Sequence, residues 1–146
     1  MTDIPLIFEA RGYVTVRVLI RAGRYHVCGP VKFYVDTGSP ESLISEEDAK
    51  RLMFPITKLT YDKTSLMGGA KIRTAEVKDI ELTFRVGEDA AQKIHMGVFR
   101  VAKSLWTKKE AIACSSSILG NDFLLKNKLS LHVNPLKNEA YYKEEA

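Results

Sequence analysis

Alternation of apolar and polar residues along short stretches is the feature that most constrains this fold. Residues 80–86 read IELTFRV, with an apolar side chain at every second position, which is the period of a strand with one buried face. Gly- and Pro-containing turn signals separate such stretches, and helical crossovers between most of them are lacking. We therefore expect a mostly β protein with half-buried strands and no α/β layering. The strand-like stretches are residues 13–20, 31–35, 80–86, 94–101, 129–133 and 139–143.

Two segments depart from this pattern and predict short helices, at residues 45–53 and 121–128. Ser45 is a good N-cap with Asp48 three residues later, as in a capping box. Asn121 is a candidate cap for the second helix. The side chains expected to face the core are Ile44, Ala49, Leu52 and Met53 beside the first helix, and Phe123, Leu124 and Leu125 in the second.

Length and composition indicate the number of domains and argue against a membrane segment and a nucleic-acid partner. The 146 residues suggest one domain, residues 1–146. No apolar run approaches the roughly 20 residues that cross a bilayer, so we expect no membrane segment. The net charge of +4 comes from scattered basic residues, which argues against a nucleic-acid partner.

The N-terminal residues do not read as a signal peptide, because Asp3 and Glu9 are acidic. Cys28 and Cys114 form no disulfide framework and no CxxC pair. We therefore expect a reducing compartment, cytoplasmic or otherwise intracellular.

Side chains that bind metals or attack substrates are sparse. The three histidines are scattered, and none has ligand spacing to another, so we expect no metal site. Residues 115–117 are three serines without a surrounding Gly-x-Ser-x-Gly, which argues against a serine nucleophile.

A carboxylate follows one of the apolar stretches directly. Residues 33–45 read FYVDTGSPESLIS, so that Asp36 opens a polar turn made of Thr37, Gly38 and Ser39. Such an aspartate is either a turn residue that accepts local N–H groups or a catalytic acid. A second segment, ILGNDFL at residues 118–124, bears on the choice.

Together these two segments resemble the retropepsin-like aspartic proteases of retroviruses and gypsy-type retrotransposons. In that family Asp-Thr/Ser-Gly-Ala/Ser runs into Ser-x-Ile-Ser and a short helix, and Ile-Leu-Gly-x-Asp-Phe/Trp-Leu follows later. The similarity extends from about residue 12 to residue 143. It implies a closed β-barrel acid-protease fold with one or two short helices. It also implies a homodimer that cleaves peptide or protein substrates without a metal or organic cofactor.

The resemblance assigns Asp36, Thr37 and Gly38 to catalysis. Because the chain holds one Asp-Thr-Gly, the second carboxylate would come from a second copy, and the two would share a proton and activate water. Gly38 would allow a tight turn, Thr37 would hydrogen-bond across the interface, and Ser39 would line the substrate groove. Residues 118–120 would pack behind the active-site loop.

The family also closes a glycine-tipped hairpin, the flap, over its substrate. Residues 57–65 and 70–77 are candidate flap strands, with Met67, Gly68 and Gly69 as substrate-binding residues at the tip. An ordinary hairpin turn is the simpler interpretation of the two glycines.

Several alternatives stay open at this stage. The connection at residues 102–114 is longer than in compact retroviral members, and its role is undefined. The strand that pairs across a dimer axis is residues 129–133, 140–142 or 4–8. Asp122 is interpreted as a carboxylate at a helix N-terminus. The rival function is an inactive dimerisation or peptide-binding module, and the chain is also compatible with one part of a larger precursor.

Overall fold

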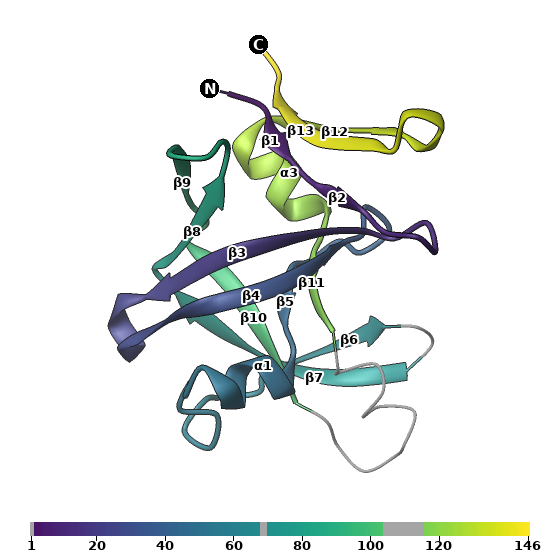
Figure 1. Cartoon of the computed structure of the whole chain (residues 1–146). Helices are drawn as coiled ribbons and strands as arrows, with labels where there is room; N and C mark the ends of the chain where they lie inside the picture. The colour runs from purple at the N-terminus through teal and green to yellow at the C-terminus, as the bar shows by residue number, and fades with distance from the viewer. Residues whose placement is uncertain (1, 68–69, 104–115) are drawn as a thin grey trace.

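The computed structural model describes residues 2–67, 70–103 and 116–146, and most of them lie in strands (Figure 1). The predicted mostly β class with short helices is confirmed. The strands are β1 (Ile4–Pro5), β2 (Ile7–Phe8), β3 (Val14–Ala22), β4 (Val27–Val35), β5 (Leu43–Ile44), β6 (Lys63–Met67), β7 (Ala70–Lys78), β8 (Ile80–Arg85), β9 (Ala91–His95), β10 (Val98–Lys103), β11 (Ser117–Leu119), β12 (Leu129–Asn134) and β13 (Glu139–Glu144). The helices are α1 (Glu46–Arg51), α3 (Asn121–Asn127) and the 3-10 turns η1 (Gly23–Tyr25) and η2 (Pro135–Lys137).

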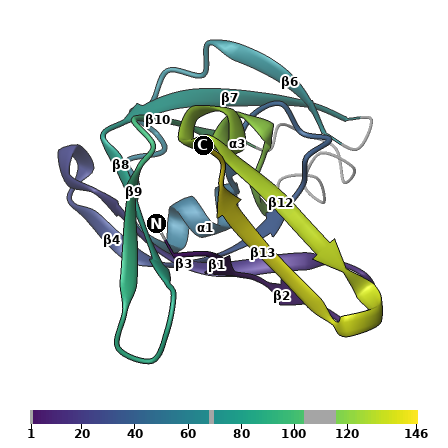
Figure 2. The same ribbon diagram turned by 90° about the horizontal axis from the view of Figure 1, so that it is seen from above.

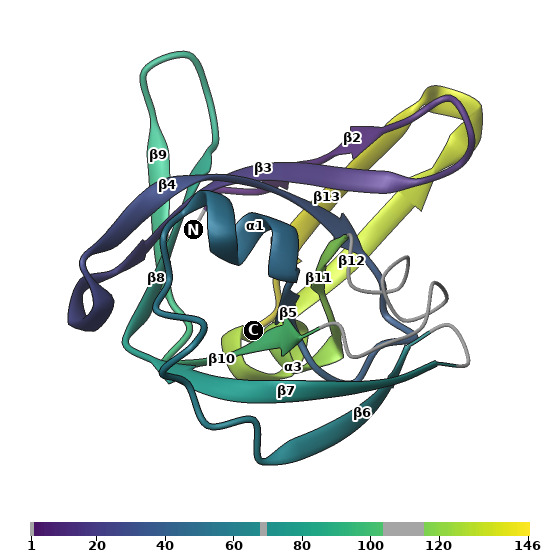
Figure 3. The same cartoon turned by 90° about the horizontal axis from the view of Figure 1, so that it is seen from below.

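The main sheet curls around the core without closing. Its strand order within the described residues is β6-β7-β10-β5-β11-β4-β3-β8-β9, with β2 beside β3. The end strands β6 and β9 do not pair with one another, and they lie on different sides of the molecule (Figures 2 and 3). The predicted closed barrel is therefore wrong, because closure requires the two end strands to hydrogen-bond.

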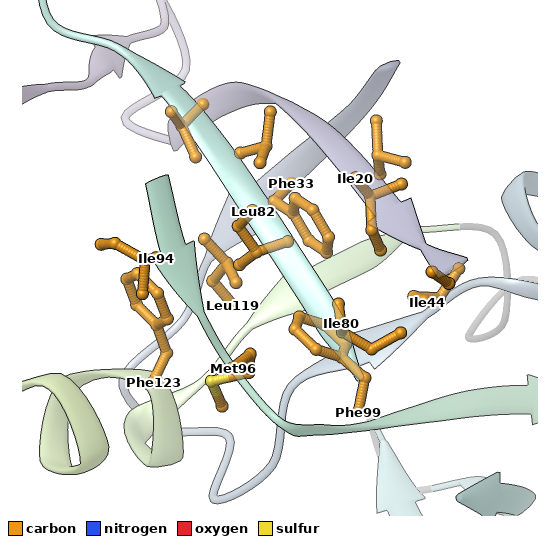
Figure 4. Packing of buried hydrophobic residues seen from close by; sticks show 14 of the residues in the cluster. Ile20, Phe33, Ile44, Ile80, Leu82, Ile94, Met96, Phe99, Leu119 and Phe123 are labelled. Atoms are coloured by element: carbon orange, nitrogen blue, oxygen red, sulfur yellow. The ribbon is translucent and has the colours of Figure 1, made fainter. Parts of the chain in front are cut away.

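A helix and a second sheet cover the apolar face that barrel closure would otherwise bury. Phe123 of α3 packs on Phe84 of β8, with ring centroids 5.6 Å apart, and on Tyr142 of β13, at 5.3 Å. All three side chains are buried. Figure 4 shows Phe123 beside Ile94 in the same core, to which β1, β3, β4, β5, β7, β10, β11 and β12 also contribute. Burial against α3 and β13 thus replaces strand pairing at this end of the sheet.

The second sheet joins residues from both ends of the described chain. Its order is β1-β13-β12, so β13 is the central strand, with Ile4 opposite Tyr142 on one side and Leu131 opposite Tyr142 on the other. The β12–β13 hairpin projects from the rest of the molecule (Figure 2). This arrangement leaves β12 as an outer strand.

Three strand predictions needed correction in their bounds. Residues 31–35 form only the last part of β4, which begins at Val27. Residues 94–101, expected as one strand, form β9 and β10, and the chain changes direction between them at Met96 and Gly97. The first flap strand begins at Lys63 and not at residue 57, because turn hydrogen bonds such as Lys58 N–H to the Pro55 carbonyl shape the preceding segment.

The helix predictions are confirmed in position and partly wrong in detail. Ser45 caps α1, its Oγ accepting a hydrogen bond from Asp48 N at 3.0 Å. Met53 was expected in the core, but it follows the helix end with a φ of 67° and is 82% exposed. Leu125 is 74% exposed, and the N-cap of α3 is Gly120 instead of Asn121. No helix in the described part of the chain is long and apolar enough to span a membrane.

Alkaline pH is expected to destabilise the protein through Tyr142. Burial raises the pKa of its phenol above the ordinary value. The folded state favours the neutral phenol. The contribution of Tyr142 to the free energy of unfolding is therefore complete below the unfolded-state pKa of about 10 and is lost as pH rises above it. Urea unfolding between about pH 8 and 11 should show a steeper loss of stability in wild type than in Tyr142→Phe. Tyr13→Phe, at an exposed position, is the control and should follow wild type.

Candidate active site

Two parallel strand ends hold Asp36 in place. Strand β4 ends at Val35 and runs parallel to β11, with Val35 opposite Leu119. The next backbone N–H, that of Asp36, donates to the Leu119 carbonyl at 3.0 Å. Ser39 N–H then donates to the Asp36 carbonyl at 3.1 Å and closes a turn. The polar turn predicted after the apolar strand is thus anchored on the Ile-Leu-Gly segment.

The Asp36 carboxylate is exposed and held by its own turn. Gly38 N–H donates to Asp36 Oδ1 at 2.9 Å. A Cβ added to Gly38 would lie 3.1 Å from the same oxygen, closer than an ordinary contact, so glycine permits this approach. Thr37 is exposed as well, and its predicted contact with a second copy stays a prediction.

A buried serine and an aspartate brace the loop from behind. Ser42 Oγ accepts from Gly120 N–H at 3.0 Å and donates to Asp122 Oδ1 at 2.6 Å. Ser42 N–H donates to Asp122 Oδ2 at 3.0 Å, across 80 residues of sequence. Asp122 also accepts from Phe123 N–H in the first helical turn, at 2.8 Å. Sequence reasoning placed Asp122 at a helix start but missed Ser42, although both lie within the two quoted motifs.

Gly120 sits where a side chain has no room. A Cβ there would lie 2.6 Å from the Ser39 carbonyl oxygen and 2.7 Å from that of Glu41. The same Ser39 carbonyl accepts from Asn121 N–H at 2.7 Å. Ser39 Oγ donates to the Glu41 carbonyl at 2.8 Å, so this hydroxyl stabilises the loop, and its predicted contact with substrate is untested.

A cavity of about 630 Å³ opens beside Asp36. Its lining includes Tyr13, Tyr34, Ser116 and Ile118. The two tyrosine rings meet edge to face, with centroids 5.9 Å apart and planes at 87°. Tyr13, Tyr34 and Ser116 were not predicted as site residues, and Ile118 was expected only to pack behind the loop. The available signal was strand alternation, since Tyr34 and Asp36 are two residues apart at the end of β4.

The candidate flap forms a hairpin, with Met67 of β6 opposite Ala70 of β7. Gly68, Gly69 and the side chain of Met67 lie outside the described residues, so the predicted substrate contacts there remain predictions. The 102–114 connection is described only as far as Lys103, where β10 ends. Within the described residues, no group of three His, Cys, Asp or Glu side chains is placed to hold a metal ion.

The sequence pattern of the aspartyl protease family matches residues 16–123, a span that contains Asp36 and both residues of the brace, Ser42 and Asp122. The chain belongs to the aspartyl protease family. A search of curated protein sequences found no match.

The fold of this aspartyl protease is similar to that of a solved retropepsin-like protease. A retropepsin-like aspartic protease from Rickettsia conorii is 20% identical, with a TM-score of 0.63, over 97% of this chain and 90% of the other. The retroviral protease-like domain of Ddi1 from Leishmania major is 14% identical, with a TM-score of 0.44, over 80% and 79%. The Rickettsia similarity shows a retropepsin-like fold and, with the family match, confirms the resemblance drawn from the sequence.

Proposed function

We propose that this aspartyl protease is an active endopeptidase that cleaves extended polypeptides with water held between two Asp36 carboxylates, one from each copy of a homodimer. The observation that carries the proposal is the placement of Asp36. Its carboxylate is solvent-exposed, yet its turn is fixed by Leu119 and Gly38. Exposure gives access to substrate, and fixation keeps the carboxylate oriented for reaction.

Peptide hydrolysis needs one group that takes a proton from water and one that gives a proton to the departing amine. Two neighbouring carboxylates supply both, because like charges a few ångströms apart hold one proton between them, as in other aspartic proteases. Asp-Thr-Gly occurs once in the chain. A second copy related by a twofold axis therefore supplies the second Asp36.

The outer strand β12 is the best candidate for pairing with that second copy. The central strand β13 is bonded on both sides, which removes residues 140–142 from the predicted choices. Strand β1 has only two residues, one of them Pro5, which has no N–H to donate.

Hydrogen-bonded pairs alternate along an antiparallel ladder. Because Glu145 N–H donates to the Lys128 carbonyl, Val133 presents its N–H to the open edge.

Val133→Pro is expected to convert a dimer into a monomer and to abolish cleavage. The substitution removes an outward N–H while leaving the bonds from β12 to β13 in place. Val133→Ala keeps that N–H and is the matched control, expected to remain dimeric and active. Sedimentation equilibrium gives the oligomeric state. A Val133→Pro protein that is still dimeric would exclude the β12 edge.

The substrate would lie extended between the Asp36 loop and the β6–β7 hairpin. Extended peptides bind through backbone hydrogen bonds to strands, with side chains entering pockets. The cavity lined by Tyr13, Tyr34 and Ile118 suits an apolar side chain next to the cleaved bond. The hairpin would act as the flap.

The decisive experiment is cleavage of a diverse peptide pool by wild type, scanned from about pH 3 to 8. Cleavage at defined bonds, lost in Asp36→Asn, is the expected result, and the cleaved sites report the side-chain preference. A dimer that cleaves nothing at any pH would overturn the proposal in favour of an inactive peptide-binding module.

A further inference from the structure

Four charged side chains join the Asp36 loop to the base of the β6–β7 hairpin, and we call them the clasp. They are Glu41, Asp62, Lys63 and Arg100. Glu41 Oε1 contacts Lys63 Nζ, and Glu41 Oε2 lies 3.6 Å from Arg100 Nε. Arg100 Nη1 donates to Asp62 Oδ1 at 2.8 Å. The order of contacts is Lys63, Glu41, Arg100, Asp62, so acids and bases alternate and both ends lie at the base of the hairpin.

Glu41 is an integral part of the active-site loop. Its carbonyl accepts from Ser39 Oγ, and the same carbonyl oxygen is one of the two oxygens that crowd Gly120. The next residue is Ser42, which Asp122 holds. A displacement of Glu41 would therefore also move the backbone of the turn that carries Asp36.

Both ends of the clasp lie at the start of β6. Lys63 is the first residue of that strand, and Asp62 precedes it. Within the described residues β6 pairs only with β7, so it is an edge strand of the sheet. Backbone pairing of β6 with β7, β7 with β10 and β10 with β5 already connects the hairpin to the loop. The clasp adds a direct link between side chains at the base of the hairpin.

The centre of the clasp is sheltered, which strengthens its interactions. Arg100 is 15% exposed and Glu41 26%, whereas Lys63 and Asp62 are more open to solvent. Arg100 N–H also donates to the Ser42 carbonyl at 3.4 Å. The Arg100 hydrogen bond is the main cause that lowers the pKa of Asp62 from its ordinary value. Partial burial reduces screening by water and salt.

We propose that the clasp is a positioning device that couples the Asp36 loop to the β6–β7 hairpin and so sets the width of the substrate groove. This inference rests on the proposed protease function. The clasp residues do not act on the scissile bond. They set how readily the hairpin closes over a bound peptide, so their loss weakens substrate binding more than the chemical step.

The test compares charge-removing and charge-keeping substitutions. Glu41→Gln and Lys63→Gln are each expected to raise KM about three- to fivefold, with kcat within about twofold of wild type. Lys63→Arg should keep KM near the wild-type value. Lys50→Gln is the control, since it breaks the comparable Lys–Glu pair to Glu46 on α1, with N and O 3.4 Å apart, and should leave KM unchanged.

Hydrogen exchange supplies a second readout that does not depend on activity. In Glu41→Gln, backbone amides of β6 and β7 should exchange faster than in wild type, while those of β3 and β8 should not. Unchanged exchange in the hairpin would overturn the clasp, as would an unchanged KM in both Gln variants of an active enzyme. Faster hairpin exchange in a protein that cleaves no peptide would retain the coupling and reject the protease function.

Discussion

Asp36→Asn is expected to lower the rate of peptide cleavage at least about 1000-fold while leaving thermal unfolding unchanged. An amide cannot take or give the proton that hydrolysis requires, but its oxygen still accepts from Gly38 N–H. The side chain is exposed, so the substitution buries nothing new. The measurements are kcat/KM on the best peptide of the pool and the Tm. A variant that retains cleavage would place the chemistry elsewhere.

The same variant tests whether the active site is shared between copies. A tenfold excess of Asp36→Asn chains, equilibrated with wild type, should place most wild-type chains in mixed dimers with one carboxylate. Activity per wild-type chain should then fall roughly tenfold, by random pairing of subunits. Unchanged activity per wild-type chain would contradict the shared site. Excess Val133→Pro is the control, because a chain that does not pair should not inhibit.

Gly120→Ala is expected to reduce both stability and activity. The new methyl group would lie 2.6 to 2.7 Å from two backbone oxygens, and backbone cannot rotate away as a side chain can. The strain should cost about 1–3 kcal/mol of unfolding free energy. Displacement of the Ser39–Glu41 backbone moves the Asp36 turn, and a shift of about 1 Å is enough to reduce catalysis roughly 100-fold.

Urea unfolding and kcat/KM at a temperature where the variant is fully folded separate these two effects. Gly23→Ala is the matched control, because no atom lies within 4 Å of the position of its Cβ. It should leave both measurements near wild type. A Gly120→Ala protein as stable and active as Gly23→Ala would show that the loop does not depend on this contact.

Local patterns in the sequence predicted the mostly β content, the short helices and the turn that carries Asp36, but not the open sheet. Alternation over residues 80–86 gave β8 nearly to its bounds, and the Ser45 cap placed α1. Both features depend on neighbouring residues only. The exposed Met53 was predicted wrongly because helical spacing was extended beyond Arg51, where α1 ends.

Features that depend on contacts between residues far apart in the sequence could not be predicted from the sequence. Alternation says that a strand has one buried face, but not what covers that face. The sheet stays open, and Phe123 and Tyr142 cover its apolar face where pairing of β6 with β9 was expected, an outcome of tertiary packing. The bond from Ser42 to Asp122 spans 80 residues, and the pairing of these two polar groups is visible only once α3 is docked.

The brace behind Asp36 also dictates when the active-site loop can form during synthesis. The loop is translated early, but Leu119, Gly120 and Asp122, which hold it, come much later in the chain. A nascent chain that ends before residue 117 carries Asp-Thr-Gly without the contacts that shape it. Assembly of the loop therefore waits for contacts of high sequence separation, which form late in folding. A nascent chain therefore gains a shaped Asp36 loop only after β11 and the start of α3 have left the ribosome.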